Sequence, residues 1–166
     1  RKIGPAWEQT TEIGPLVDAE HQAFVTGWID KSIGEGARLV LDGRNVKIPG
    51  YESGYFVGPT IFDHVTADMS CGWEEVFGPV LYMKRVKSFD EGIELINSSE
   101  FANGASIFTQ SGYHAREFAR RIHGGMVGIN VGIPVPISVF PFSGHKNSFY
   151  GDLHVMGRDG VAFFTE

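Results

Sequence analysis

The sequence contains one cysteine, Cys71, among its 166 residues. A single thiol excludes an internal disulfide framework and a zinc site built from several cysteines, and it fits a reducing compartment. The chain also lacks an apolar run near the roughly 18 residues that a membrane-spanning helix needs. Its opening residues lack the apolar segment of a signal peptide. We therefore expect a protein that has no membrane partner and is not secreted.

Charge is nowhere concentrated along the chain. There are 20 acidic residues against 14 Lys and Arg, which gives a net charge of −6. A field of that sign does not attract phosphate backbones, so we expect no nucleic-acid partner. The length fits one domain, residues 1–166. Because the chain opens on Arg1 and closes on the apolar run 161–166 without a cap, we expect both ends to be cut from a longer chain.

The first half of the sequence predicts a helix, a strand and a long loop. Asp18 is a suitable helix N-cap, and Gly34 and Gly36 favour an exit. Residues 37–43 are typical of a strand, and the recurring Gly and Pro of 45–62 indicate a hairpin or an extended surface loop. Four apolar residues of the helix lie at roughly helical spacing: Phe24, Trp28, Ile29 and Ile33.

The second half alternates strands and helices. The predicted order is strand 79–86, helix 88–99, strand 104–110, helix 111–125 and strand 126–130. Apolar side chains share one face of each helix: Phe89, Ile93 and Ile96 in the first, and Ala115, Phe118, Ala119 and Ile122 in the second. Such an order favours right-handed crossovers, and so an α/β fold with an open sheet and flanking helices.

Two stretches rich in glycine or proline lie near the end of the chain. Residues 123–128, HGGMVG, follow a helix and precede a strand, which is the reverse of a dinucleotide-binding loop. We therefore expect Gly124 to be the C-cap of the preceding helix. Residues 131–152 combine three prolines with bulky apolar side chains. A loop of that length and aromatic content is typical of a functional segment.

The sequence alone indicates few candidates for catalytic residues. The six histidines never stand at a metal-ligand spacing from an acid or a cysteine, so we expect no metal site. Cys71 has no adjacent base and no helix start that would lower its pKa, which favours a structural role. Glu74 and Glu75 are adjacent and project in different directions, so they cannot act on one atom as an acid–base pair. A charged loop and a binding role for one of them are both open at this point.

Residues 74–80, EEVFGPV, resemble the E-E-[IV]-F-G-P-V signature of the aldehyde dehydrogenase superfamily. Further similarity follows in order at 54–62, GYFVGPTIF, at 104–130, and at 141–148, PFSGHKNS. More narrowly, LDGR at 41–44 and IPVP within the apolar loop are similar to the methylmalonate-semialdehyde dehydrogenase branch, which forms an acyl-CoA. The resemblance covers nearly the whole chain.

The resemblance implies roles for three residues. Glu75 matches the glutamate that holds the hydroxyls of the nicotinamide-side ribose of NAD, and Phe77 matches the aromatic that packs beside that ribose. Phe142 matches an aromatic in the wall of the substrate tunnel. An ionised carboxylate only accepts hydrogen bonds and can take two hydroxyl donors, which suits orientation better than proton transfer. Glu74 receives no role.

The family's thiol nucleophile, oxyanion-hole asparagine and Gly-rich cofactor loop belong upstream of the matched motifs, and Cys71 matches none of them. The resemblance therefore implies the C-terminal catalytic part plus an oligomerisation segment, without the Rossmann cofactor domain and without activity on its own. For the parent enzyme it implies oxidation of methylmalonate or malonate semialdehyde with NAD and coenzyme A to acyl-CoA, CO2 and NADH, in valine or myo-inositol catabolism.

The resemblance also implies partners and a location for the parent enzyme. We expect a small-molecule semialdehyde as substrate and a homo-oligomer, either a dimer or a tetramer. The location would be the cytoplasm of a bacterium or the mitochondrial matrix of a eukaryote. Two alternatives are an ordinary hydrolytic aldehyde dehydrogenase and a non-catalytic assembly module derived from one.

Overall fold

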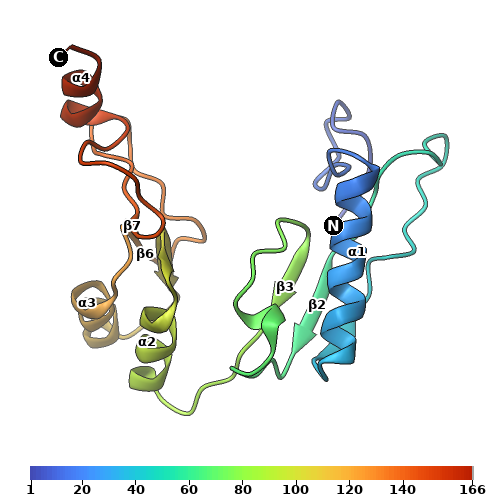
Figure 1. The fold of residues 1–166 in the computed structure, drawn as a ribbon, viewed down its shortest axis with the longest axis horizontal. Helices are drawn as coiled ribbons and strands as arrows, with labels where there is room; N and C mark the ends of the chain where they lie inside the picture. Colours follow the sequence, from blue (N-terminus) through green and yellow to red (C-terminus); the bar gives the residue numbers. More distant parts are fainter. Residues whose placement is uncertain (166) are drawn as a thin grey trace. The chain divides into compact units, whose positions relative to one another are not determined.

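The computed structural model describes residues 1–165 and shows a chain divided into two compact units, Arg1–Arg85 and Val86–Glu166 (Figure 1). Both mix helices with small sheets, as the α/β prediction requires. The assignment of residues 1–166 to a single domain stays a prediction.

The first unit is a three-stranded sheet with one long helix. Helix α1 spans Ala19–Gly34, and the strands are β1, Arg38–Leu41, β2, Thr60–Asp63, and β3, Val80–Tyr82. The strand order is β1-β2-β3, where β1 and β2 are antiparallel and β2 and β3 are parallel. A single 3₁₀ turn, η1, spans Ser70–Gly72 between β2 and β3. The predicted helix and strand of this half are confirmed. The predicted surface loop 45–62 is not confirmed at its end, because Thr60 and Phe62 are buried and belong to strand β2.

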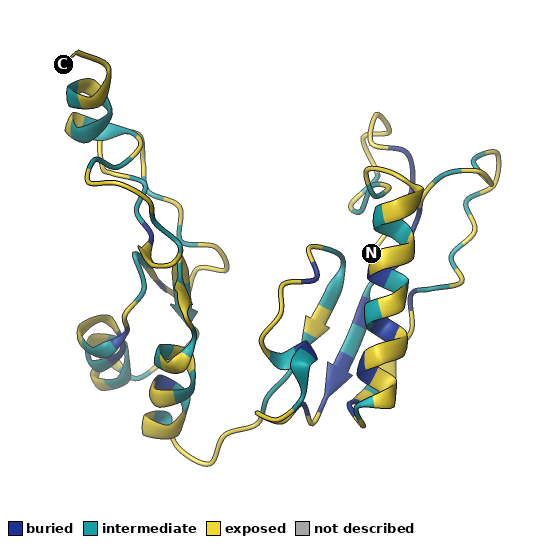
Figure 2. Cartoon of the chain, in the orientation of Figure 1, coloured by how far each residue is buried: buried dark blue, intermediate teal, exposed yellow. Residues whose placement is uncertain are grey.

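The buried face of α1 differs from the predicted one. Val25, Ile29 and Ser32 are fully buried, whereas Phe24 is 46% and Ile33 41% exposed. These three buried positions are spaced by four and three residues and form a stripe along one side of the helix. Figure 2 shows this stripe in dark blue beside the buried strand β2. Trp28 is half-buried and packs against this core, and the small side chain of Ser32 occupies the last position of the stripe.

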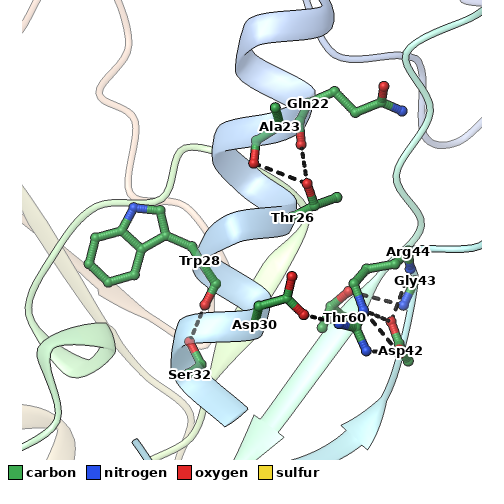
Figure 3. A network of polar contacts seen from close by, with 10 residues as sticks. All are labelled: Gln22, Ala23, Thr26, Trp28, Asp30, Ser32, Asp42, Gly43, Arg44 and Thr60. Atoms are coloured by element: carbon green, nitrogen blue, oxygen red, sulfur yellow. Dashed lines mark hydrogen bonds and ion pairs between the residues drawn. The ribbon is translucent and has the colours of Figure 1, made fainter. Parts of the chain in front are cut away.

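The LDGR segment joins α1 to the sheet (Figure 3). The Arg44 guanidinium donates to both carboxylate oxygens of Asp42, at 2.6 to 3.1 Å, and pairs with Asp30 of α1. The N–H of Gly43 donates to the buried hydroxyl of Thr60 at 3.1 Å. A Cβ at Gly43 would lie 2.0 Å from the carbonyl oxygen of Gly58, so only glycine fits this crossing of two backbones.

The second unit begins with an alternation of helices and strands. Its elements are α2, Phe89–Ser98, β4, Phe101–Ala102, β5, Gly104–Ile107, α3, Gly112–Arg121, and β6, Met126–Ile129. Strands β5 and β6 are parallel and are connected through α3. A small core lies between the helices and these strands, built from Ile93, Phe118 and Ile122 with Phe89, Ala105 and Ile107 packed against them. Both predicted helices are confirmed. Of their predicted inward faces, Ile96 is 44% exposed and Ala119 is also exposed, and Ile122 is buried but lies just beyond the end of α3.

The last part of the second unit has little regular structure. Strand β7, His145–Lys146, pairs antiparallel with β4, and helix α4 spans Gly157–Thr165. Within residues 1–165, the strands form three separate small sheets where the sequence favoured one open sheet. None of the helices described is long and apolar enough to cross a membrane.

The prediction that Gly124 caps α3 is wrong. The helix ends at Arg121, and its C-cap residue is Ile122, which has extended backbone angles of φ −75° and ψ 138°. Ile122 is only 7% exposed and belongs to the small core. We attribute the end of the helix at Arg121 to the burial of Ile122. With Ile122 in an extended conformation, the chain continues toward β6 without a left-handed residue at Gly124.

Candidate functional site

The EEVFGPV segment lies between η1 and β3 and has no regular secondary structure before Val80. Val76 is buried in the core of the first unit, whereas Glu75 and Phe77 on either side of it are exposed. The Phe77 side chain is 79% exposed. Val76 thus anchors a segment that presents a carboxylate and an aromatic ring to solvent.

Phe77 has a backbone φ of 50°, in the left-handed region that few residues with a Cβ adopt. Its carbonyl oxygen lies 2.9 Å from the Nε2 atom of His21, in the first turn of α1. His21 was not predicted from the sequence as a neighbour of Phe77. No local signal could have revealed it, because the two residues are 56 positions apart.

Glu74 differs from Glu75 in its backbone. Its N–H donates to the carbonyl of Ser70 at 3.1 Å and so closes the turn that η1 begins. Both carboxylates are exposed. Glu74 therefore belongs to the end of a turn, while Glu75 directly precedes the buried anchor Val76.

Trp73, just before the segment, and Lys84 form a cation–π contact. The Lys84 ammonium lies 3.6 Å from the centre of the Trp73 ring, and the indole N–H donates to the carbonyl of Ala67 at 2.7 Å. Burial lowers the pKa of Lys84. These contacts fix Trp73 against the fold just before the two glutamates.

Cys71 is packed into the core of the first unit and is 1% exposed. Burial raises the pKa of its thiol, the opposite of what a nucleophilic thiolate needs. Its backbone N–H donates to the Glu35 carboxylate at 3.2 Å, and the Ser70 hydroxyl donates to the same group. The hydrogen bond from Ser70 is the main cause of a lowered Glu35 pKa. These surroundings favour packing over catalysis for Cys71.

Phe142 belongs to the second unit. Its ring is half-buried, and its N–H donates to the carbonyl of Val155 at 2.7 Å. The loop before it borders a cavity of about 370 Å³ next to β6. Much of this loop is apolar and exposed, at Val131, Ile133, Val135, Ile137, Val139 and Phe140.

Within residues 1–165, no three His, Cys, Asp or Glu side chains come close enough together to hold a metal ion. The exposed groups of the segment are instead the carboxylates of Glu74 and Glu75 and the aromatic ring of Phe77. Such groups bind hydroxyl donors and flat rings.

Comparison with curated proteins finds close similarity to enzymes that act on malonate semialdehyde. The chain is 51% identical over 164 residues to malonate-semialdehyde dehydrogenase 2 of Bacillus thuringiensis strain Al Hakam, and it covers 33% of that protein. Identity to malonate-semialdehyde dehydrogenase of Pseudomonas aeruginosa PAO1 is 49%, again over 33% of the relative. The chain therefore spans about a third of the length of the curated relatives it matches.

Solved structures share the fold. A Sinorhizobium meliloti 1021 protein assigned as a methylmalonate-semialdehyde dehydrogenase, solved with NAD, superposes with a TM-score of 0.96 at 44% identity, over 99% of this chain and 34% of its own. The methylmalonate-semialdehyde dehydrogenase of Oceanimonas doudoroffii gives 0.95 at 44% identity, with the same coverage. The family model for the aldehyde dehydrogenases matches residues 1–166 from end to end. The chain therefore belongs to the aldehyde dehydrogenase family, as the EEVFGPV segment predicts.

Proposed function

We propose that this chain is the C-terminal catalytic and oligomerisation part of an NAD-dependent methylmalonate- or malonate-semialdehyde dehydrogenase. The observation that carries the proposal is the pair Glu75 and Phe77, presented to solvent on either side of buried Val76. In this proposal Glu75 holds the hydroxyls of the nicotinamide-side ribose and Phe77 packs beside it. The named relatives and an NAD complex among the similar structures support it.

The residues present suit a dinucleotide chemically. Vicinal ribose hydroxyls donate two hydrogen bonds, and an ionised carboxylate accepts both with a charge-assisted component. An exposed aromatic ring offers a flat apolar face for the sugar and the nicotinamide. NAD supplies the hydride acceptor of the reaction, and Glu75 and Phe77 orient it.

We further propose that the parent enzyme transfers the acyl group to coenzyme A. The support is the similarity of LDGR and IPVP to the acyl-CoA-forming branch. Product analysis separates this from the hydrolytic alternative, because the first gives a thioester and the second a free acid. A non-catalytic module would give neither product.

We also propose that the parent enzyme forms a homo-oligomer, a dimer or a tetramer. Exposed apolar residues of α4, Val161, Phe163 and Phe164, support an assembled state, because large apolar side chains seldom stay in contact with water without a partner. Sedimentation of the full-length protein tests this. For location we propose the cytoplasm in a bacterium and the mitochondrial matrix in a eukaryote.

The site assignment is tested by two matched substitutions in the full-length enzyme. Glu75→Gln should lower kcat/KM for NAD by a factor corresponding to about 1 to 3 kcal/mol, because the amide keeps an acceptor and loses the charge. Glu74→Gln should leave it nearly unchanged. Steady-state kinetics with NAD as the varied substrate measures both.

Equal effects of the two substitutions would contradict the assignment. Thermal unfolding of both variants serves as the control. Since both glutamates are exposed, neither change should shift the unfolding temperature by more than a few degrees.

A further inference from the structure

Phe77 needs an external contact to keep its conformation. Its φ of 50° lies in the left-handed region, which is unfavourable for an aromatic residue. Such a conformation persists only where the surrounding structure enforces it. The contacts that hold residues 76–78 therefore decide where the Phe77 ring and the neighbouring Glu75 carboxylate lie.

The first of these contacts is the hydrogen bond from His21. A backbone carbonyl only accepts, so the Nε2 atom of His21, 2.9 Å from the Phe77 oxygen, must carry the proton and donate. His21 is itself held in place. Its N–H donates to the Asp18 carboxylate at 2.7 Å, and its ring stacks on Phe24 with the ring centres 5.7 Å apart.

The second contact is made by Gly78. A Cβ at this position would lie 2.8 Å from a methyl carbon of Val25, so the backbone after Phe77 lies directly against α1. Val76, before Phe77, is buried in the same core cluster as Val25. One side of α1 thus holds the residues on both sides of Phe77, and His21 holds the peptide oxygen of Phe77 itself.

We propose that His21 is a positioning residue for NAD. By fixing the Phe77 carbonyl it keeps the left-handed turn, and so aims the Phe77 ring and the Glu75 carboxylate at the nicotinamide-side ribose. This inference rests on the proposed function of that pair. His21 itself does not touch the cofactor. Without its donor the peptide between Phe77 and Gly78 relaxes toward a favoured backbone angle, and the two cofactor contacts lose their common geometry.

The test uses near-isosteric substitutions in the full-length enzyme. His21→Met removes the donor, whereas His21→Gln keeps one at the end of an unbranched side chain of similar length. The matched control is Gln22→Met, which removes a comparable bond from Gln22 to the Phe56 carbonyl, 3.0 Å long, in the same helical turn. Steady-state kinetics are measured with NAD and with the semialdehyde varied in turn, beside the Glu75→Gln variant.

We expect His21→Met to lower kcat/KM for NAD about threefold to tenfold, the effect of one lost hydrogen bond, and to leave KM for the semialdehyde unchanged. His21→Gln should restore most of the loss, and Gln22→Met should show none. If His21→Met does not fold, His21→Glu replaces it, because a glutamate at the third helical position supports the cap but cannot donate to Phe77.

The outcomes separate this inference from the function on which it rests. NAD kinetics unchanged in His21→Met beside an impaired Glu75→Gln would overturn the role of His21 and leave the cofactor site standing. Equal losses in His21→Met and Gln22→Met, or no rescue by His21→Gln, would also overturn it. A neutral Glu75→Gln would remove the cofactor site, and the role of His21 with it.

Discussion

At the scale of single residues, the chemistry of Cys71 can be predicted from its surroundings. The thiol is 1% exposed and burial raises its pKa, so the reactive thiolate is both scarce and shielded. We expect iodoacetamide to modify Cys71 in the native full-length protein far more slowly than in the unfolded protein. Mass spectrometry of the peptide that contains Cys71 follows the rate. Rapid modification of the native protein at neutral pH would contradict the packing role.

The second residue-scale prediction concerns the apolar loop. Phe142→Ala should raise KM for the semialdehyde more than KM for NAD, because the family resemblance implies that this ring lies in the wall of the substrate tunnel. Phe140→Ala is a matched control, since Phe140 lies in the same loop and is 59% exposed. If KM for NAD changes and KM for the semialdehyde does not, Phe142 has been assigned to the wrong ligand.

The exposed residues of the candidate site, Glu75 and Phe77, could be predicted from the sequence. The residue that supports them, His21, could not. Glu75 and Phe77 stand in a local motif that the eye can match. His21 is fixed to Phe77 only by the folded chain, through a bond between residues far apart in sequence. Supporting contacts of this kind depend on tertiary packing, so a motif search cannot find them.

At the scale of elements, two glycines should respond oppositely to alanine. Gly27 lies in the middle of α1 with open space where its Cβ would be, so Gly27→Ala should stabilise the protein by about 0.5 to 1 kcal/mol. A Cβ at Gly43 would collide with the backbone of Gly58, so Gly43→Ala should destabilise it by about 1 to 3 kcal/mol, as overpacking does. Denaturant unfolding measures both changes. Destabilisation by Gly27→Ala would show that α1 is covered at that point.

Helix positions were predictable because their signals are local. Asp18 and Ser88 accept a hydrogen bond from the N–H three residues later, as N-caps do. Strand pairing was not predictable in the same way. The residues of segments 79–86 and 104–110 do not indicate with which strand each of them pairs. In the structure, β3 and β5 belong to different small sheets.

At the scale of the whole molecule, acid should weaken the fold. The Arg85 guanidinium lowers the pKa of Asp63 from 3.8 to about 2, and hydrogen bonds lower those of Glu35 and Asp42. A carboxyl whose folded pKa is depressed stabilises the protein above its unfolded pKa, and that stability is lost as pH falls through the folded value. We therefore expect the midpoint temperature of thermal unfolding to decrease as the pH is lowered from about 5 to about 2.

Asp63→Asn provides the control for this prediction. The variant should be less stable than the wild type at neutral pH, and the difference should shrink as pH approaches 2, where the wild-type carboxyl also becomes protonated. Chemical unfolding at several pH values gives the comparison. A constant difference across the range would show that the ionised carboxylate contributes nothing.

Of the whole molecule, the family was predictable from sequence and is confirmed, because its motifs recur in order along the chain. The division into two compact units was not. Composition changes little between residues 1–85 and the remainder, so no linker signal marks the boundary. The units are defined by which residues contact one another in the folded chain, and a single sequence does not display these contacts.

The left-handed turn at Phe77 has a consequence for how this position would evolve. Glycine and asparagine adopt φ of 50° more readily than phenylalanine. In a library of variants of the full-length protein selected only for thermal stability, glycine or asparagine should therefore become enriched at position 77. Because we propose that Phe77 contacts NAD, a library selected for growth on the semialdehyde should retain phenylalanine. The two selections would favour different residues at position 77. The frequency of phenylalanine after selection would show whether stability or cofactor binding dominates at this position.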